Sequence, residues 1–350
     1  MNTKSLRAVA ALGWAPPHSP ATRVTIARGD GRLTVRASMG GQPVIRWWDD
    51  SDEPFTPRTV PCRSICKGLA GVNEAVIGAT SNGLQIYTDD FTAAFRADDA
   101  EAAETVPDGG VTLAADDVAR FAWVVRSAAG TDNRYGLNGI HVEDVDGHPT
   151  ALATDGSRIN RARIDALAGL TLPPKTLLPR DWWHTAAKLA GKGGMRVVVV
   201  DRFVWAAGDG WAVRGRLIEG EFPAWRQVMP AAFGAEVRVD APALMAALAR
   251  VTPLAETTHY GPVVVILDDG VWKLTATGHA DIGGFVRASV PVTATGWTKR
   301  GLRPLYLADV LRGVVGSVTF REVAGKDLEL SMITVDLGDG RVAVVMPVRL

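Results

Sequence analysis

Cysteine is scarce in this chain, net charge is absent and no apolar run is long, and each absence excludes a class of protein. Lys and Arg number 38 and so do Asp and Glu, which excludes a polycation that coats nucleic acid but is compatible with a basic face balanced by an acidic one. No apolar run reaches the roughly 18 residues of a transmembrane helix. The N-terminal segment lacks the apolar core and cleavage site of a signal peptide. We therefore expect a soluble, cytoplasmic protein with no membrane partner.

The two cysteines, Cys62 and Cys66, do not indicate a disulfide framework or a metal site. They are four residues apart in a segment with helical character, which places them on one helix face. A zinc site would need further ligands at characteristic spacings. We interpret both as small apolar side chains in a reducing compartment.

Motifs of catalysis and cofactor binding are also missing. The chain has no Gly-x-Ser-x-Gly elbow, phosphate loop or dinucleotide fingerprint, and its histidines lack metal-ligand spacing. Asp144 and Asp146 resemble the start of a calcium loop, but the downstream Glu is absent, so a hairpin turn is expected. An all-β carbohydrate-active enzyme is disfavoured because no acid–base pair of carboxylates is identifiable. The sequence predicts no catalytic residue, no metal site and no cofactor, which favours a binding or scaffold role.

What the chain does have is a pattern that recurs three times. An amphipathic helix is expected at the start of each third, over residues 5–12, 115–129 and 243–251. Strand-like runs follow each of these helices, for example 23–27 with 32–37 and 263–267 with 271–276. A second helix is expected over residues 62–69, 180–190 and 306–315, and then a hairpin turn at 82–83, 209–210 and 339–340.

This repeat of about 115 residues predicts three similar α+β domains, each with two helices and antiparallel sheets. The expected boundaries give domains over residues 1–109, 110–233 and 234–350. Apolar residues continue almost to the C-terminal carboxylate, so the last strand is expected either to pack or to form a docking surface.

Four short segments carry a more specific resemblance. Residues 134–140 read Arg-Tyr-Gly-Leu-Asn-Gly-Ile and residues 153–159 read Ala-Thr-Asp-Gly-Ser-Arg-Ile. Residues 220–230 read Gly-Glu-Phe-Pro-Ala-Trp-Arg-Gln-Val-Met-Pro, and the chain ends in Val-Val-Met-Pro-Val-Arg-Leu. In this order they resemble the bacterial sliding clamp family, the β subunit of DNA polymerase III. The resemblance implies a head-to-tail homodimer whose domains close a ring around duplex DNA.

The resemblance implies a pocket for short, partly apolar peptides between the second and third domains. Its motif positions correspond here to Leu137, Thr154, Gly156, Ser157, Arg158, Ile159, Pro223, Gln227, Val228, Tyr306, Val344, Val345, Met346, Pro347, Val348, Arg349 and Leu350. Ser157 stands where the family has a histidine, Gln227 where it has an arginine and Val348 where it has a methionine. These departures are expected to alter the peptide preference.

The resemblance also implies basic side chains that face duplex DNA without reading its sequence. Candidates are Arg134 and Tyr135 on a loop and the helix residues Lys4, Arg7, Arg63, Lys67, Arg120, Arg126, Arg180, Lys188, Arg250, Arg303 and Arg312. For each helix residue, a solvated helix face is the alternative interpretation.

The implied partners are a second copy of the chain, the DNA polymerase III α subunit, the clamp loader and other proteins with clamp-binding peptides. The implied function is a non-catalytic processivity factor of DNA replication. The alternative is a specialised clamp homologue, such as a resistance or mobile-element copy, with an altered peptide preference.

Overall fold

The computed structural model of the chain describes residues 23–39, 42–49, 55–61, 76–80, 83–87, 92–96, 98–99, 105–130, 136–230, 232–258, 261–324 and 331–350. The chain divides into two compact units. The first comprises Met1–Val118, Gly169–Pro173 and Asp181–Leu217, and the second comprises Ala119–Ala168, Pro174–Arg180 and Ile218–Leu350. The division into three repeated domains stays a prediction.

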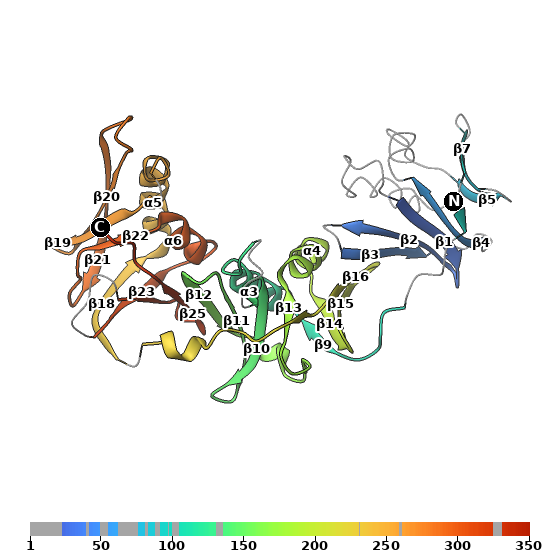
Figure 1. Cartoon of the computed structure of the whole chain (residues 1–350), viewed down its shortest axis with the longest axis horizontal. Helices are drawn as coiled ribbons and strands as arrows, with labels where there is room; N and C mark the ends of the chain where they lie inside the picture. Colours follow the sequence, from blue (N-terminus) through green and yellow to red (C-terminus); the bar gives the residue numbers. More distant parts are fainter. Residues whose placement is uncertain are drawn as a thin grey trace. The chain divides into compact units, whose positions relative to one another are not determined.

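The first unit is built on a nine-stranded antiparallel sheet (Figure 1). In sheet order its strands are β8 (Asp98–Asp99), β4 (Phe55–Pro61), β1 (Arg23–Gly29), β2 (Arg32–Met39), β3 (Gln42–Asp49), β16 (Trp211–Arg216), β15 (Phe203–Gly208), β14 (Met195–Val200) and β9 (Val111–Leu113). A three-stranded sheet contains β5 (Val76–Thr80), β6 (Gly83–Tyr87) and β7 (Thr92–Arg96). Alternate residues of the large sheet, such as Val24 and Ile26, are buried, as a half-buried strand requires.

Helix α4 (Arg180–Ala190) contributes two buried tryptophans, Trp182 and Trp183. A Cβ at Gly215 on β16 would lie 2.6 Å from the Trp182 ring, so only glycine permits this approach of helix and strand.

The second unit contains a thirteen-stranded sheet. In sheet order its strands are β17 (Ile218–Glu219), β13 (Thr176–Pro179), β10 (Gly139–Val145), β11 (His148–Thr154), β12 (Arg158–Arg163), β25 (Arg341–Val345), β24 (Ile333–Asp336), β23 (Ser317–Val323), β18 (Phe233–Asp240), β21 (Phe285–Ala294), β20 (Val271–Thr277), β19 (Val263–Asp268) and β22 (Arg300–Leu302). Most of α3 (Ala115–Val125), together with α5 (Ala241–Ala255) and α6 (Pro304–Leu311), belongs to this unit. Two 3-10 turns are η3 (Asp165–Leu167) and η4 (Trp225–Val228).

The described helices test four of the helix predictions. The prediction for 180–190 is confirmed by α4. Helix α3 ends at Val125 rather than at residue 129, because the Ala129 N–H instead bonds the Leu137 carbonyl. Helix α5 is longer than predicted, and the Asp240 carboxylate caps its start by accepting from the Ala243 N–H at 3.0 Å.

Helix α6 covers Pro304–Leu311 rather than 306–315. Pro304 occupies its first turn, where a missing N–H costs nothing, and Gly313 at φ +77° follows its end. No described helix is long and apolar enough to cross a membrane. The predicted helices at 5–12 and 62–69, with Cys62 and Cys66, lie outside the described residues.

The hairpin predictions are confirmed wherever they fall on described residues. Strands β1 and β2 pair, as do β19 and β20, and the two-residue turn Asp209-Gly210 joins β15 to β16. The Asp339-Gly340 turn lies between the paired strands β24 and β25. Asp144 and Asp146 belong to the β10–β11 hairpin, where the Asp144 carboxylate accepts from the Gly147 N–H at 2.8 Å. Asn82 lies outside the described residues.

The pairing of β12 with β25 positions the candidate site, because it joins the middle of the sequence to its C-terminal end in one sheet. Arg158 pairs with Val345 and Ile159 with Val344. The regular strand stops at Val345 because Pro347 has no N–H to donate. The chain then continues to Val348, which forms a bridge to Gly301 on β22.

Candidate functional site

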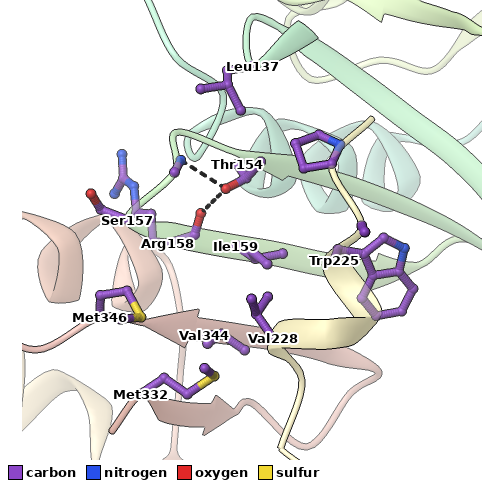
Figure 2. A pocket seen from close by; sticks show the side chains of 13 residues that line it. Leu137, Thr154, Ser157, Arg158, Ile159, Trp225, Val228, Met332, Val344 and Met346 are labelled. Carbon is purple, nitrogen blue, oxygen red and sulfur yellow. Dashed lines mark hydrogen bonds between the residues drawn. The ribbon is translucent and has the colours of Figure 1, made fainter. Parts of the chain in front are cut away.

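A cavity of about 160 Å³ lies in the second unit between three segments of the chain (Figure 2). One wall is the β11–β12 turn with Leu137, the second is the linker around η4, and the third is formed by β25 and the residue before β24. Its lining residues are Leu137, Thr154, Gly156, Ser157, Arg158, Ile159, Pro223, Ala224, Trp225, Val228, Met332, Val344 and Met346. Most of these side chains are apolar, so the cavity suits an apolar ligand group.

The β11–β12 turn is held by hydrogen bonds among its own residues. The Thr154 hydroxyl donates to the Arg158 carbonyl at 2.6 Å and accepts from the Gly156 N–H at 3.1 Å (Figure 2). The Asp155 carboxylate accepts from the N–H groups of Ser157 and Arg158 at 3.0 and 3.1 Å. Gly156 has φ +88°, a conformation that glycine adopts without strain. The sequence Thr-Asp-Gly-Ser-Arg therefore specifies this wall locally.

Arg158 connects the turn to the neighbouring helices. Its guanidinium donates to the carboxylates of Asp155 and Asp309, at 3.0 and 2.9 Å, and to the Arg126 carbonyl at 2.7 Å. The guanidinium carbon also lies 4.4 Å from the centre of the Tyr306 ring. The Arg158 side chain is 8% exposed, so these partners compensate a largely desolvated charge.

Trp225 is the centre of the linker wall. It packs with Leu152, Ile159 and Val344 in one buried cluster. Its indole N–H donates to the Glu143 carboxylate at 2.6 Å, and this carboxylate also accepts from Arg226 at 3.1 Å. Glu143 on β10 thereby fixes the 3-10 turn that carries the lining residue Val228.

The third wall carries two methionines, Met332 and Met346, beside Val344 (Figure 2). The Met346 N–H donates to the Ser157 carbonyl at 2.9 Å, which continues the β12–β25 pairing past the end of the strand. Met346 is 40% exposed, so its thioether is accessible at the mouth of the cavity. Methionine side chains adapt to ligand groups of different shapes.

The remaining predicted pocket residues do not line the cavity. Gln227 is exposed on η4. Val345 is buried but lies outside the cavity, because its side chain points to the opposite face of β25 from that of Val344. Tyr306 lies behind Arg158 and does not line the cavity. The guanidinium carbons of Arg158 and Arg303 lie 4.4 and 4.7 Å from the centre of its ring. The last residues of the chain, Pro347, Val348, Arg349 and Leu350, run past the cavity toward Gly301.

Sequence reasoning missed three lining residues, Ala224, Trp225 and Met332. Ala224 and Trp225 lie in the same linker segment as Pro223, so the motif predicts this segment but not its central side chain. Met332 had no nearby motif, because it reaches the cavity only through the pairing of β24 with β25.

The predicted DNA-facing residues divide by environment. Lys188, Arg250 and Arg312 are exposed, whereas Arg120, Arg126, Arg180 and Arg303 are partly buried. Arg120 donates to the Asp339 carbonyl at 2.6 Å, and Arg126 donates to the carbonyls of Asp309 and Arg312 at 3.2 Å each. Arg134, Tyr135, Lys4, Arg7, Arg63 and Lys67 lie outside the described residues.

Arg126 lies among charged side chains of both signs. Burial is the largest influence on its guanidinium and lowers its pKa; the charges of Arg312 and Arg341 lower it further, while Asp309 opposes this shift. Among the described residues, no group of three or more His, Cys, Asp or Glu side chains is placed to hold a metal ion.

The chain matches none of the protein-family models. It is 26% identical over 221 residues to a protein of Pseudomonas aeruginosa named Beta sliding clamp, a match that spans 63% of this chain and 59% of the relative. It is 25% identical over 314 residues to the Beta sliding clamp of Pseudomonas putida, spanning 85% of this chain and 84% of the relative.

Solved structures match the whole chain. The DNA polymerase sliding clamp of Pseudomonas aeruginosa superposes with a TM-score of 0.83 at 22% identity, covering 100% of this chain and 99% of that structure. The sliding clamp of Bartonella birtlesii bound to griselimycin superposes with a TM-score of 0.84 at 18% identity, covering 99% and 97%.

The chain therefore has the α+β fold of the bacterial DNA polymerase sliding clamps. The curated relatives carry the more particular name Beta sliding clamp, and a solved structure of the Pseudomonas aeruginosa clamp is named DNA polymerase III subunit beta, which confirms the predicted resemblance.

Proposed function

We propose that the protein is a DNA sliding clamp, which encircles duplex DNA and tethers the replicative polymerase for processive synthesis. The observation that carries the proposal is the apolar cavity where the Thr154–Ile159 turn, the η4 linker and the C-terminal strand meet. Three segments far apart in the sequence converge on one cavity, and each carries a motif that resembles the clamp pocket. An apolar groove with a methionine wall suits short peptides from several partners.

The proposal gives the basic helix residues a role. Exposed cations such as Lys188 and Arg250 would attract phosphates, and a topological link needs no strong grip on the DNA. Arg120 and Arg126 bond to groups of the chain itself, so we expect them to contribute less to DNA binding.

The proposed partners are duplex DNA without sequence specificity, a second copy of the chain, the DNA polymerase III α subunit, the clamp loader and other proteins with clamp-binding peptides. A head-to-tail homodimer would close the ring and pair the exposed sheet edges. In this role the protein is a non-catalytic processivity factor and acts in the cytoplasm, where the bacterial chromosome is replicated.

A specialised clamp homologue is the second candidate, and Ser157 favours it. Ser157 lines the cavity at a position where the bacterial sliding clamp family has a histidine, so this wall lacks the family's aromatic ring. Gln227 and Val348 also depart from the family, although neither lines the cavity. Complementation of a strain depleted of its own clamp separates the two candidates, because rescue contradicts a purely specialised role.

The proposed function is tested by retention on DNA. The purified protein is loaded with a clamp loader onto nicked circular DNA, and the bound fraction is measured by gel filtration before and after linearisation. A sliding ring stays on the circle and leaves the linear molecule, whereas a protein that grips DNA stays on both. Light scattering in parallel should show a dimer, and a monomer at micromolar concentration would contradict the ring.

A further inference from the structure

A buried ion pair lies in the C-terminal part of the second unit, away from the cavity lining. Arg300 on β22 donates from Nε to the Glu322 carboxylate on β23 at 2.9 Å, and the two side chains are 0% and 3% exposed. Burying two charges costs several kcal/mol per ion, and apolar replacements are often as stable. A gain in stability is therefore a weak explanation for the presence of this ion pair. Its contacts with neighbouring segments suggest that it positions them.

Glu322 is held in place by two further donors. The Thr298 N–H donates to both carboxylate oxygens, at 3.0 and 3.2 Å, and the Thr298 hydroxyl donates at 3.2 Å. Thr298 therefore holds the Glu322 carboxylate in place, and the carboxylate in turn orients the Arg300 guanidinium.

The other end of the guanidinium reaches the residue that precedes the lining residue Met332. Arg300 Nη1 donates to the Ser331 carbonyl at 3.3 Å, and Ser331 directly precedes the lining residue Met332. Glu322 also pairs through its backbone with Ile333, the residue after Met332. Met332 is thus held on both sides by the two partners of the ion pair.

The neighbouring residue on β22 holds the second methionine segment. The Gly301 carbonyl accepts from the Val348 N–H at 2.8 Å, two residues after Met346. Adjacent residues of one short strand therefore anchor both methionine-bearing segments of the cavity. An apolar side chain at position 300 could fill the same space, but it could not bond the Ser331 carbonyl.

We infer that Arg300 and Glu322 are positioning residues of the peptide pocket, which set the spacing of Met332 relative to Met346 and hence the affinity for an apolar peptide. The inference rests on the proposed function of the cavity. A positioning role can be distinguished from a purely stabilising role by experiment. A purely stabilising pair affects peptide binding only when its loss unfolds the protein.

The test uses the full-length double variant Arg300→Met/Glu322→Gln. The two substitutions remove both charges together, and the introduced amide oxygen can still accept from Thr298, so the unfolding midpoint should stay near that of the wild type. The bond to Ser331 is lost. We expect about a tenfold weaker Kd for a fluorescent peptide carrying the clamp-binding segment of the DNA polymerase III α subunit. A second readout is the NMR spectrum of methyl-labelled methionine, in which the Met332 and Met346 signals should move.

Arg321→Met is the matched control, since Arg321 lies beside Glu322 on β23. Its ion pairs with Glu236 and Asp336 are far more exposed than the pair of Arg300 with Glu322. This control should leave both the peptide Kd and the two methionine signals unchanged.

Unchanged binding in a stably folded double variant would overturn the inference. If the double variant unfolds, Arg300→Lys keeps the charge beside Glu322 but cannot also reach Ser331, and the same loss of affinity is expected. A wild-type protein that binds no peptide would instead refute the proposed function.

Discussion

Two walls of the cavity are held in place in different ways. One is the turn wall, formed by the β11–β12 turn, and the other is the methionine wall, which carries Met332 and Met346. The backbone of the turn wall is closed by hydrogen bonds between residues at most four positions apart, such as that from Thr154 to the Arg158 carbonyl, and the Arg158 side chain adds distant bonds to Asp309 and Arg126. The methionine wall is anchored by residues distant in sequence, with Arg300 bonded to Ser331 and Gly301 to Val348. A local arrangement survives changes elsewhere in the fold, whereas a distant anchor transmits them. We therefore expect the methionine wall to be the adjustable side of the pocket.

The largest expected effect is on the methionine wall. Deleting Met346–Leu350 removes the Met346 side chain and the Gly301–Val348 bond, so binding of the polymerase-derived peptide should fall by at least about a hundredfold in fluorescence anisotropy. Strand β25 ends at Val345, so the fold and the oligomeric state should be retained. Deleting only Arg349 and Leu350, which do not line the cavity, is the control and should preserve most of the affinity. Full affinity after the longer deletion would refute the pocket assignment.

The next effect tests the turn wall. Arg158→Ala leaves the carboxylates of Asp155 and Asp309 without a common partner in a largely buried site, so the free energy of unfolding in urea should fall by about 3 kcal/mol. The control is Arg163→Ala on the same strand, because its pair with Asp165 is exposed to solvent and should contribute no measurable stability. Equal effects of the two substitutions would show that the buried network does not hold the turn.

A glycine substitution separates the walls more sharply. A Cβ at Gly301 would lie 2.6 Å from the Val348 carbonyl oxygen and 2.7 Å from the Leu350 side chain, so Gly301→Ala should displace the C-terminal segment. We expect about a tenfold loss of peptide affinity by calorimetry. At Gly296 a Cβ would meet its nearest neighbour at 3.5 Å, which is ordinary contact, so Gly296→Ala should bind like the wild type. The same affinity in both variants would contradict the anchoring role of β22.

A smaller effect is expected at the turn itself. Ser157→His would restore an aromatic ring at the cavity and should tighten binding of a family-type peptide by a fewfold, since one additional apolar contact contributes about 1 kcal/mol. Ser157→Thr serves as the control for added size without an aromatic ring. Weaker binding of the histidine variant would indicate that this pocket selects a peptide of different shape.

The smallest effect concerns the turn that precedes the C-terminal strand. Burial acts to raise the pKa of the Asp339 carboxyl, but the hydrogen bonds and charge of Arg341 and the charge of Arg120 hold it below the ordinary value of 3.8. This stabilisation is present above the unfolded-state pKa and is lost as the pH falls through the lower folded-state value. Wild type should therefore exceed Asp339→Asn in urea stability at about pH 6, and the difference should shrink at about pH 2.5. A difference independent of pH would exclude a role of the ionised carboxylate.

Most of the fold that sequence patterns could predict depended on local chemistry. The cap at Asp240, the turns at Asp209-Gly210 and Asp144, and the extent of α4 follow from residues that interact within a few positions. Helix α3 is shorter than the sequence predicts, because the Ala129 N–H bonds the Leu137 carbonyl, an acceptor that is available only in the folded protein. The partners of backbone groups near a helix end lie outside the helix, so no pattern within the helix reports them.

The sequence by itself determined the turn wall of the cavity, because Thr154 to Arg158 satisfy one another's hydrogen bonds. Only the tertiary structure decided that Met332 and Trp225 complete the cavity, that Tyr306 lies behind Arg158, and that Arg300 reaches Ser331. The physical reason is the range of the interactions. Hydrogen bonds within a turn are encoded in adjacent residues, whereas the pairing of β12 with β25 and the burial of an ion pair depend on segments that meet only after folding.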